Sequence, residues 1–321
     1  MAVKPVEKMV KEEKEMRKVL CATLSDLART NKNIVYLDAD LTSAGGMGAF
    51  TKEFPDQTFN VGIAEANMIG VACGLSATGK IPFAHSFGTF ASRRCYDQIF
   101  LSGGYAKSNL KVIGSDPGVT AAFNGGTHMP FEDVGIMRNI PTATVIEPTD
   151  SVMLQNLIPQ IAAHFGVDYI RLKRKNAVSI YEEGTQFTIG KAVKLAEGND
   201  VTIIASGIMV ELACKAAAEL KNNGINARVL DMFTIKPIDS EAIISAANET
   251  GCIVTCENHN VINGLSSAVA DVVVRNCPVP MEFVGIEDEF GEVGPETYLR
   301  ERFKLTTENI IDKVKKAISR K

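Results

Sequence analysis

The 321-residue sequence lacks the features that mark membrane-spanning, secreted or nucleic-acid-binding proteins. Its longest apolar runs are too short to span a bilayer. A formal net charge of −4 gives no electrostatic reason to expect nucleic acid or an acidic membrane surface as a partner. Seven irregularly spaced cysteines, with no secretory leader, favour reduced thiols and a cytoplasmic location. Packing explains Cys252 and Cys256 better than metal binding, so we predict no metal ligands in this chain.

What the sequence does contain is an alternation of apolar strand and helix patterns that stops and then restarts. With 45% hydrophobic and 22% charged residues, the chain is long enough for two substantial cores. Alternating strands and helices with short connections require wound, mostly parallel sheets. We therefore predict an α/β protein with one wound domain at 1–180, a linker at 181–195 and a second wound domain at 196–321.

The expected elements follow from apolar spacing and from glycines between them. Strands are predicted at 34–37, 58–61, 81–84, 110–114, 143–146, 168–172, 201–205, 227–230 and 253–255. A helix that carries Glu65 is predicted after the strand at 58–61, and further helices are predicted from about Thr89 and at 150–164, 209–222, 239–247 and 264–275. The charged residues 7–15 are expected to be the solvated start of a long first helix that packs inward from Met16 to Ala28.

The most informative stretch is Val-Gly-Ile-Ala-Glu-Ala-Asn-Met at 61–68. Glu65 has apolar neighbours here, and a carboxylate in such a place is expensive to ionise unless it is hydrogen-bonded. Phe83, Phe87 and Phe90 follow about twenty residues later. An acid near phenyl rings suits a flat heteroaromatic ligand with a ring nitrogen. On residue types alone, however, core packing and a Glu paired with a polar group are the favoured interpretation.

Three further segments point to ligand binding. A polar turn containing Asp40 follows a buried strand, where α/β proteins usually bind ligands, although helix capping explains Asp40 equally well. His128, one of only four histidines, lies in a loop whose glycines allow close approach to a ligand. Arg174 follows another strand, and its planar fork suits phosphate oxygens. His259, beside Glu257, is given a structural role.

The segment at 61–68, Pro-Phe-Ala-His-Ser-Phe-Gly-Thr-Phe at 82–90 and Gly-Gly-Thr-His-Met-Pro-Phe-Glu-Asp at 125–133 together resemble the pyrimidine-binding half of transketolases. These thiamine-diphosphate enzymes move two-carbon ketol units between sugar phosphates, as in the pentose phosphate pathway. The resemblance covers nearly the whole chain, and 228–240 resembles the family's C-terminal domain. The Gly-Asp-Gly motif of the family's other half is absent from the sequence. The resemblance therefore implies the C-terminal subunit of a split transketolase.

The resemblance also implies roles for individual residues. Glu65 and His128 become catalytic: the first shares a proton with the ring nitrogen of the cofactor, and the second stabilises oxygen charge or transfers a proton. The implied cofactor-binding residues are Asp40, Leu41, Ile63, Glu65, Phe87, Phe90 and Arg93. The implied substrate-binding residues are Arg17, Ser43, Asn124, His128 and Arg174. Two positions depart from the family pattern, which often has tyrosine at Arg93 and an acidic residue at Asn124.

The missing half implies a partner. We expect an N-terminal transketolase subunit to hold the diphosphate and Mg²⁺ or Ca²⁺, and a homodimer of this chain to form part of an α2β2 assembly. Alternatives are a split transketolase for an unusual, branched sugar phosphate, which Asn124 keeps open, and the β chain of a 2-oxoacid dehydrogenase. The chain is too short for deoxyxylulose-phosphate synthase. From another class, it could be a non-catalytic binding or regulatory module of the same fold.

Overall fold

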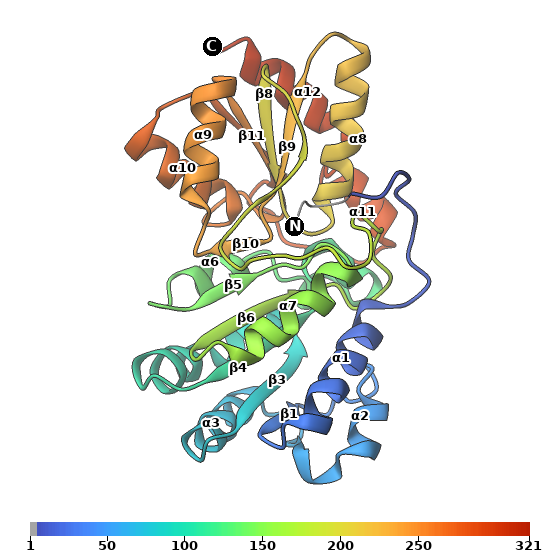
Figure 1. Ribbon diagram of the computed structural model, residues 1–321, viewed down its shortest axis with the longest axis vertical. Coiled ribbons are helices and arrows are strands. Elements are labelled where there is room, and N and C mark those ends of the chain that lie inside the picture. The colour runs from blue at the N-terminus through green and yellow to red at the C-terminus, as the bar shows by residue number, and fades with distance from the viewer. Residues whose placement is uncertain (1–4) are drawn as a thin grey trace.

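The computed structural model describes residues 5–321, which form two sheets flanked by helices, one lying above the other in Figure 1. The first sheet has seven strands in the order β10-β5-β6-β4-β3-β1-β2, and the second has five in the order β12-β11-β8-β9-β7. The predicted fold class, α/β with two wound and mostly parallel sheets, is confirmed. The first four residues of the predicted first domain lie outside the described residues.

The strands are short and mostly buried. They are β1 (Ile34–Asp38), β2 (Thr58–Asn60), β3 (Ile81–Phe87), β4 (Leu110–Ser115), β5 (Thr144–Ile146), β6 (Val167–Leu172), β7 (Val193–Ala196), β8 (Val201–Ala205), β9 (Ala227–Asp231), β10 (Thr234–Lys236), β11 (Ile253–Asn260) and β12 (Met281–Ile286). Strands β1 and β4 are buried along their whole length, as expected for parallel strands covered on both faces.

The helices cover the faces of both sheets. They are α1 (Met16–Thr30), α2 (Gly48–Glu53), α3 (Glu65–Ala77), α4 (Gly88–Ser92), α5 (Tyr96–Gln98), α6 (Asp133–Arg138), α7 (Ser151–Ala163), α8 (Met209–Asn222), α9 (Ser240–Thr250), α10 (Leu265–Asn276), α11 (Glu296–Arg302) and α12 (Thr307–Ile318). Short 3-10 turns η1 (Pro55–Gln57), η2 (Arg93–Cys95), η4 (Gly118–Asn124) and η5 (Gly126–His128), and the π-helix η3 (Ile99–Tyr105), complete the set. Within residues 5–321, the helices are too short or too polar to cross a membrane.

The two halves of the chain are joined by a shared strand. Strand β10 comes from the C-terminal half but pairs antiparallel with β5 at the edge of the first sheet (Figure 1). The second sheet also ends on an antiparallel strand, β7, paired with β9. The boundary proposed at 181–195 separates the strand–helix patterns, whereas hydrogen bonding carries the first sheet past it to Lys236.

The expectation that 7–15 starts the first helix is wrong. Helix α1 begins at Met16, and the preceding residues run antiparallel to 178–181 through bridges at Pro5–Tyr181 and Lys11–Val178. The charged residues take part in tertiary contacts here, because the Glu12 carboxylate accepts a 3.0 Å hydrogen bond from the backbone N–H of Ser151. This leading segment therefore packs along the residues that follow β6 and contacts the start of α7.

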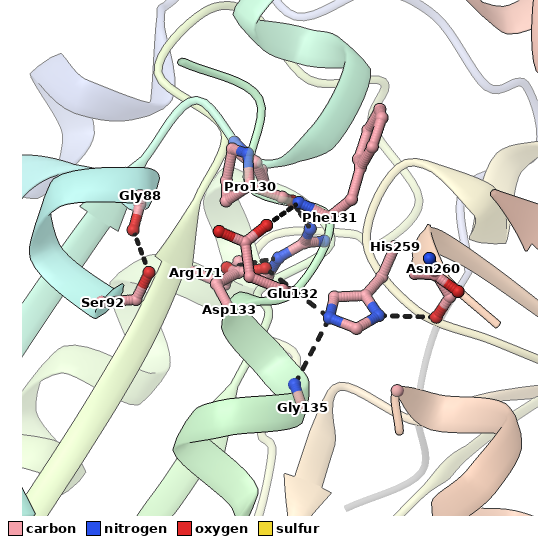
Figure 2. Close-up of polar contacts among 12 residues, drawn as sticks. Gly88, Ser92, Pro130, Phe131, Glu132, Asp133, Gly135, Arg171, His259 and Asn260 are labelled. Carbon is pink, nitrogen blue, oxygen red and sulfur yellow. Dashed lines mark hydrogen bonds and ion pairs between the residues drawn. The ribbon is translucent and has the colours of Figure 1, made fainter. Parts of the chain in front are cut away.

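The helix expected from Thr89 is broken into α4, η2 and α5. The Ser92 hydroxyl donates to the Gly88 carbonyl at 2.6 Å (Figure 2), and Ser92 has non-helical angles of φ −111° and ψ −87°. Side-chain competition for a helix carbonyl is typical of serine and bends helices. The helices and strands that the sequence did not reveal are α2, α6, α11, α12, β7, β10 and β12.

A fully buried arginine connects the two sheets. Arg171 on β6 donates through Nε to Asp133 at 2.9 Å and through Nη1 to Glu147 at 2.8 Å. Its Nη2 donates at 2.7 Å to the carbonyl of Asn258, on β11 of the second sheet. The guanidinium thus has partners on both sheets, and Figure 2 shows it beside Asp133.

His259 extends this connection and is structural, in keeping with its predicted role. Burial lowers the pKa of His259 to about 4, so the ring is neutral near pH 7. Its Nδ1 lies 2.7 Å from the Asn260 carbonyl, and its Nε2 accepts from the N–H of Gly135 at 3.3 Å (Figure 2). Glu257 meanwhile accepts from the N–H groups of Leu265 and Ser266 at the start of α10.

Replacing Arg171 by methionine tests whether this arginine holds the sheets together. The substitution leaves the Asp133 and Glu147 carboxylates buried without their cation, which costs about 3–5 kcal/mol of unfolding free energy. Urea unfolding followed by circular dichroism measures the loss. Arg29→Met, at an exposed ion pair with Glu53, is the matched control and should change the unfolding free energy far less, because solvent screens this pair. Equal effects of both substitutions would contradict the structural role.

Candidate active site

Glu65 is the first residue of α3, directly after the loop that leaves β2. Only 2% of its side chain is exposed. One carboxylate oxygen accepts from the Ser86 hydroxyl at 2.9 Å, and the other accepts from Nη1 of Arg94 at 3.0 Å. The sequence correctly predicts that this carboxylate is buried. Its hydrogen-bond partners, however, are polar side chains and not its apolar neighbours in the sequence. Each oxygen still has a free lone pair for a ligand donor.

Three rings form a wall beside this carboxylate. Phe87, Phe90 and His128 meet edge to face, with centroids 5.6 Å apart for Phe87–His128 and 5.0 Å apart for Phe90–His128. The Arg94 guanidinium carbon lies 3.8 Å from the centroid of Phe90. The buried acid and the aromatic wall are therefore linked through one arginine. This arrangement offers a flat ring both a stacking surface and a hydrogen-bond acceptor.

The loop that carries His128 is held in shape by the second sheet. Asn258 accepts from the Val119 N–H at 3.0 Å. A Cβ placed on Gly126 would lie 2.1 Å from the carbonyl oxygen of Gly291, so only glycine fits there. Gly125 has φ +78°, which also favours glycine. The C-terminal half thereby positions a loop of the first half.

His128 is half-buried, and its Nδ1 lies 2.9 Å from the Thr127 hydroxyl. Burial, together with the positive charge of Arg94, lowers the pKa of His128 below its ordinary value. The imidazole is therefore neutral near pH 7 and can accept a hydrogen bond or a proton through a ring nitrogen.

The two arginines predicted to bind the substrate anion lie close together. The Arg17 backbone N–H donates to the Arg174 carbonyl at 3.2 Å. Each side chain is paired with a carboxylate, Arg17 with Glu15 at 2.7 Å and Arg174 with Asp116 at 2.9 Å. The Arg174 guanidinium carbon also lies 5.4 Å from the centroid of Phe87, which connects this cluster to the aromatic wall.

The turn after β1 lies next to the same cluster. Arg17 donates to the Ala44 carbonyl at 2.7 Å and to that of Ser43 at 3.4 Å. Asp40 has φ +62°, is exposed and exchanges hydrogen bonds with Asn60. Asp40 does not cap a helix, because residues 42–46 form a turn and α2 begins only at Gly48. The turn is instead fixed by Asp38, which accepts from the Leu41 N–H at 3.1 Å.

Some predicted site residues do not join the wall. Arg93 turns away and forms an ion pair with Glu132 at 2.9 Å. Asn124 is exposed at the end of η4. Ile63 is 77% exposed, although it stands only two residues before the buried Glu65. An exposed isoleucine beside a buried acid leaves an apolar surface where a ligand or another chain can pack.

Arg94, Ser86 and Asp116 are the site residues that the sequence reasoning missed. Arg94 follows Phe90 by four residues, but the helix is broken at Ser92 between them, so helical spacing could not have identified the contact. Ser86 lies next to Phe87 on β3, and Asp116 follows β4, whose carboxyl end faces the site. Asp116 carried no distinguishing pattern, because acidic residues after strands are common.

His85 is a fourth missed residue, and it supports the site from the core. Its Nδ1 lies 3.1 Å from the Tyr36 hydroxyl and its Nε2 lies 3.0 Å from the Ser115 hydroxyl. Burial lowers the pKa of His85 to about 4, which keeps the ring neutral. The ring thus fixes β3 between β1 and β4, beside Asp116.

A pocket of about 400 Å³ lies nearby, between α6 and loops of the second sheet. Arg93, Glu132 and Phe290 are among its lining residues. Neither Glu65 nor Phe87 lines it. The buried acid and its aromatic wall therefore form a separate surface.

Both halves of the chain match models of known domain families. Residues 12–178 match the transketolase pyrimidine-binding domain, and residues 190–310 match the transketolase C-terminal domain. Together these matches account for most of the chain.

Whole proteins and a solved structure are similar over nearly the full length. The chain is 53% identical to the 6-deoxy-6-sulfo-D-fructose transketolase subunit SqwH of Clostridium sp. (strain MSTE9), over 97% of this chain and 96% of the relative. It is 37% identical to one of the subunits of the apulose-4-phosphate transketolase of Phocaeicola vulgatus, covering 85% and 88% respectively. A solved split-gene transketolase, described as an inactive β4 tetramer, superposes with a TM-score of 0.89 at 40% identity, covering 96% of this chain and 99% of that one.

Asp116→Asn tests the pairing of Asp116 with Arg174. Burial raises the pKa of Asp116 to about 6 from 3.8, and the Arg174 charge partly offsets this rise. Asp116 thus keeps its proton to higher pH in the native state than in the unfolded chain. The stability contributed by this carboxyl group therefore falls as pH rises from 3.8 to about 6. Asparagine tolerates the positive φ of +60° at this position and does not titrate.

We expect the unfolding free energy of Asp116→Asn, relative to the parent protein, to rise between about pH 4 and 6.5 by up to about 3 kcal/mol. Urea unfolding at several pH values measures the difference. Asp56→Asn, at an exposed position, is the control and should show no such trend. A difference that stays flat with pH for Asp116→Asn contradicts the raised pKa.

Proposed function

The chain belongs to the transketolase family and is the C-terminal subunit of a split transketolase, and from this premise we propose that Glu65 and its aromatic wall bind the aminopyrimidine ring of thiamine diphosphate. The observation that carries the proposal is the buried Glu65 carboxylate, which has spare acceptor capacity and is linked through Arg94 to the face of Phe90. The family depends on thiamine diphosphate, and these residues suit a flat ring with a polar edge.

Each residue of the site has a separate task in this proposal. Bound thiamine diphosphate supplies a carbon nucleophile and an electron sink for breaking and making carbon–carbon bonds. Glu65 accepts a hydrogen bond from the ring nitrogen and thereby holds a proton at that atom. Phe87 and Phe90 orient the ring and exclude water. His128, neutral near pH 7, stabilises oxygen charge on the sugar or takes up a proton.

We further propose that the site is completed by an N-terminal subunit that holds the diphosphate and a divalent cation. The sequence has no Gly-Asp-Gly motif. Residues 5–321 contain no group of three or more His, Cys, Asp or Glu side chains placed to hold a metal ion. The similar split-gene transketolase chain is described as an inactive tetramer, which supports a need for a partner. An α2β2 assembly with sites at the junctions fits these observations.

The substrate is proposed to be a ketose with an anionic end, bound by Arg17 and Arg174. A phosphate sugar of the pentose phosphate pathway is one candidate. A sulfonated sugar is the second, favoured by the 53% identity to a 6-deoxy-6-sulfo-D-fructose transketolase subunit. Glu15 and Asp116 neutralise part of the arginine charge, which suits a singly charged sulfonate better than a doubly charged phosphate.

Glu65→Gln is expected to reduce kcat/KM of the enzyme assembled with its partner at least about 100-fold. Glutamine keeps the shape of the side chain but cannot hold a proton at the ring nitrogen as an acid does. Steady-state transfer of a ketol unit to an aldose phosphate measures the effect. Glu53→Gln, at an exposed pair with Arg29, should retain activity. Full activity of Glu65→Gln would favour a non-catalytic module.

The requirement for a partner is tested by assaying the purified chain alone and then mixed with its partner subunit. The purified chain, given thiamine diphosphate and Mg²⁺, should not turn over xylulose 5-phosphate, fructose 6-phosphate, 6-deoxy-6-sulfofructose or apulose 4-phosphate. Adding the partner captured from the source cells should restore turnover, and the sugar with the highest kcat/KM identifies the substrate. Turnover by the chain alone would rule out the split site.

A further inference from the structure

We infer that Arg94, not its neighbour Arg93, is the residue that positions Glu65 and closes the pyrimidine side of the site. The inference rests on the proposed function and assigns a role to a residue that the sequence patterns did not single out. It concerns only side chains of this chain.

The contacts of Arg94 carry the inference. Its Nη1 donates to Glu65 at 3.0 Å, while its guanidinium lies 3.8 Å over the ring of Phe90. The Glu65 side chain is 2% exposed and that of Arg94 is 45% exposed. The guanidinium therefore spans from the buried carboxylate to the open side of the aromatic wall, where it fixes both side chains relative to each other.

The geometry assigns no such task to Arg93. The Arg93 side chain is 52% exposed and pairs with Glu132, and both residues line a different pocket. Both arginines follow the break at Ser92 and lie on the short turn η2, where consecutive side chains point in different directions. Arg94 pairs with Glu65, and Arg93 pairs with Glu132.

The electrostatic consequence is specific. A guanidinium at hydrogen-bond distance fixes one Glu65 oxygen in place, so the remaining lone pairs of the carboxylate point in set directions for a ring N–H to donate to. The other titratable groups near this pair are Cys95 and His128. Burial raises the pKa of the Cys95 thiol to about 12, so it stays neutral, whereas His128 senses the Arg94 charge.

Arg94→Met tests the inference because methionine keeps the apolar stem over Phe90 and removes the charge and the donor. In the complex with the partner and Mg²⁺, calorimetry should show thiamine diphosphate binding about tenfold more weakly near pH 7.

Two comparisons make this loss of affinity diagnostic. Arg94→Lys keeps the charge and should return the affinity most of the way to that of the parent enzyme. Because loss of Arg94 also affects His128, the Arg94→Met substitution is also made in a His128→Asn background, where the loss of affinity should persist. Arg29→Met, remote from the site at the α1–α2 pair, should bind thiamine diphosphate like the parent enzyme.

The outcomes separate this inference from the proposed function. If the parent complex binds no thiamine diphosphate, the proposed function fails and the inference fails with it. If the parent complex binds and Arg94→Met has an unchanged affinity, only the role of Arg94 is overturned. Equally weakened binding by Arg94→Met and Arg94→Lys would overturn it as well, since lost packing would then explain the effect.

Discussion

A buried charge holds this molecule together: Arg171 is fully enclosed and bonds to Asp133 and Glu147 on one side and to the backbone of β11 on the other. A guanidinium in the interior is tolerable only when its donors are satisfied, so the surrounding groups cannot move far. Strand β11 also supplies Asn258, whose side chain is hydrogen-bonded to Pro117 and Val119 at the start of the His128 loop. The strand that Arg171 binds therefore also fixes part of the site. The packing of the two sheets and the shape of the His128 loop therefore depend on the same strand.

The site itself is built at the carboxyl ends of neighbouring parallel strands. The turn with Asp40 follows β1, the Phe87 wall follows β3, Asp116 follows β4 and Arg174 follows β6. Parallel strands place these loops along one edge of the sheet, which is why residues distant in sequence meet there. The second sheet contributes shape to this edge rather than reacting groups.

Much of this arrangement was predictable from the residues, and the exceptions have physical causes. The strand and helix alternation was readable because parallel strands are buried on both faces, as β8 shows by matching its predicted bounds. The buried state of Glu65 followed from its apolar neighbours. The partner of Glu65 could not be predicted in this way, because the kink at Ser92 decides which of two adjacent arginines faces the acid. The leading segment at 7–15 was misjudged because its charges suggested a solvated helix, whereas its backbone bonds to residues 177–180.

The contact between Gly126 and Gly291 limits how this protein can change over time. A β-carbon on Gly126 would reach the backbone carbonyl of Gly291, whereas one on Gly291 would mainly displace the flexible Met129 side chain, whose sulfur lies 2.6 Å away. A substitution of Gly126 is therefore tolerated only if the Gly291 loop retreats in the same lineage. Divergence of the His128 loop at this position is tied to drift in a segment more than 160 residues further along the chain.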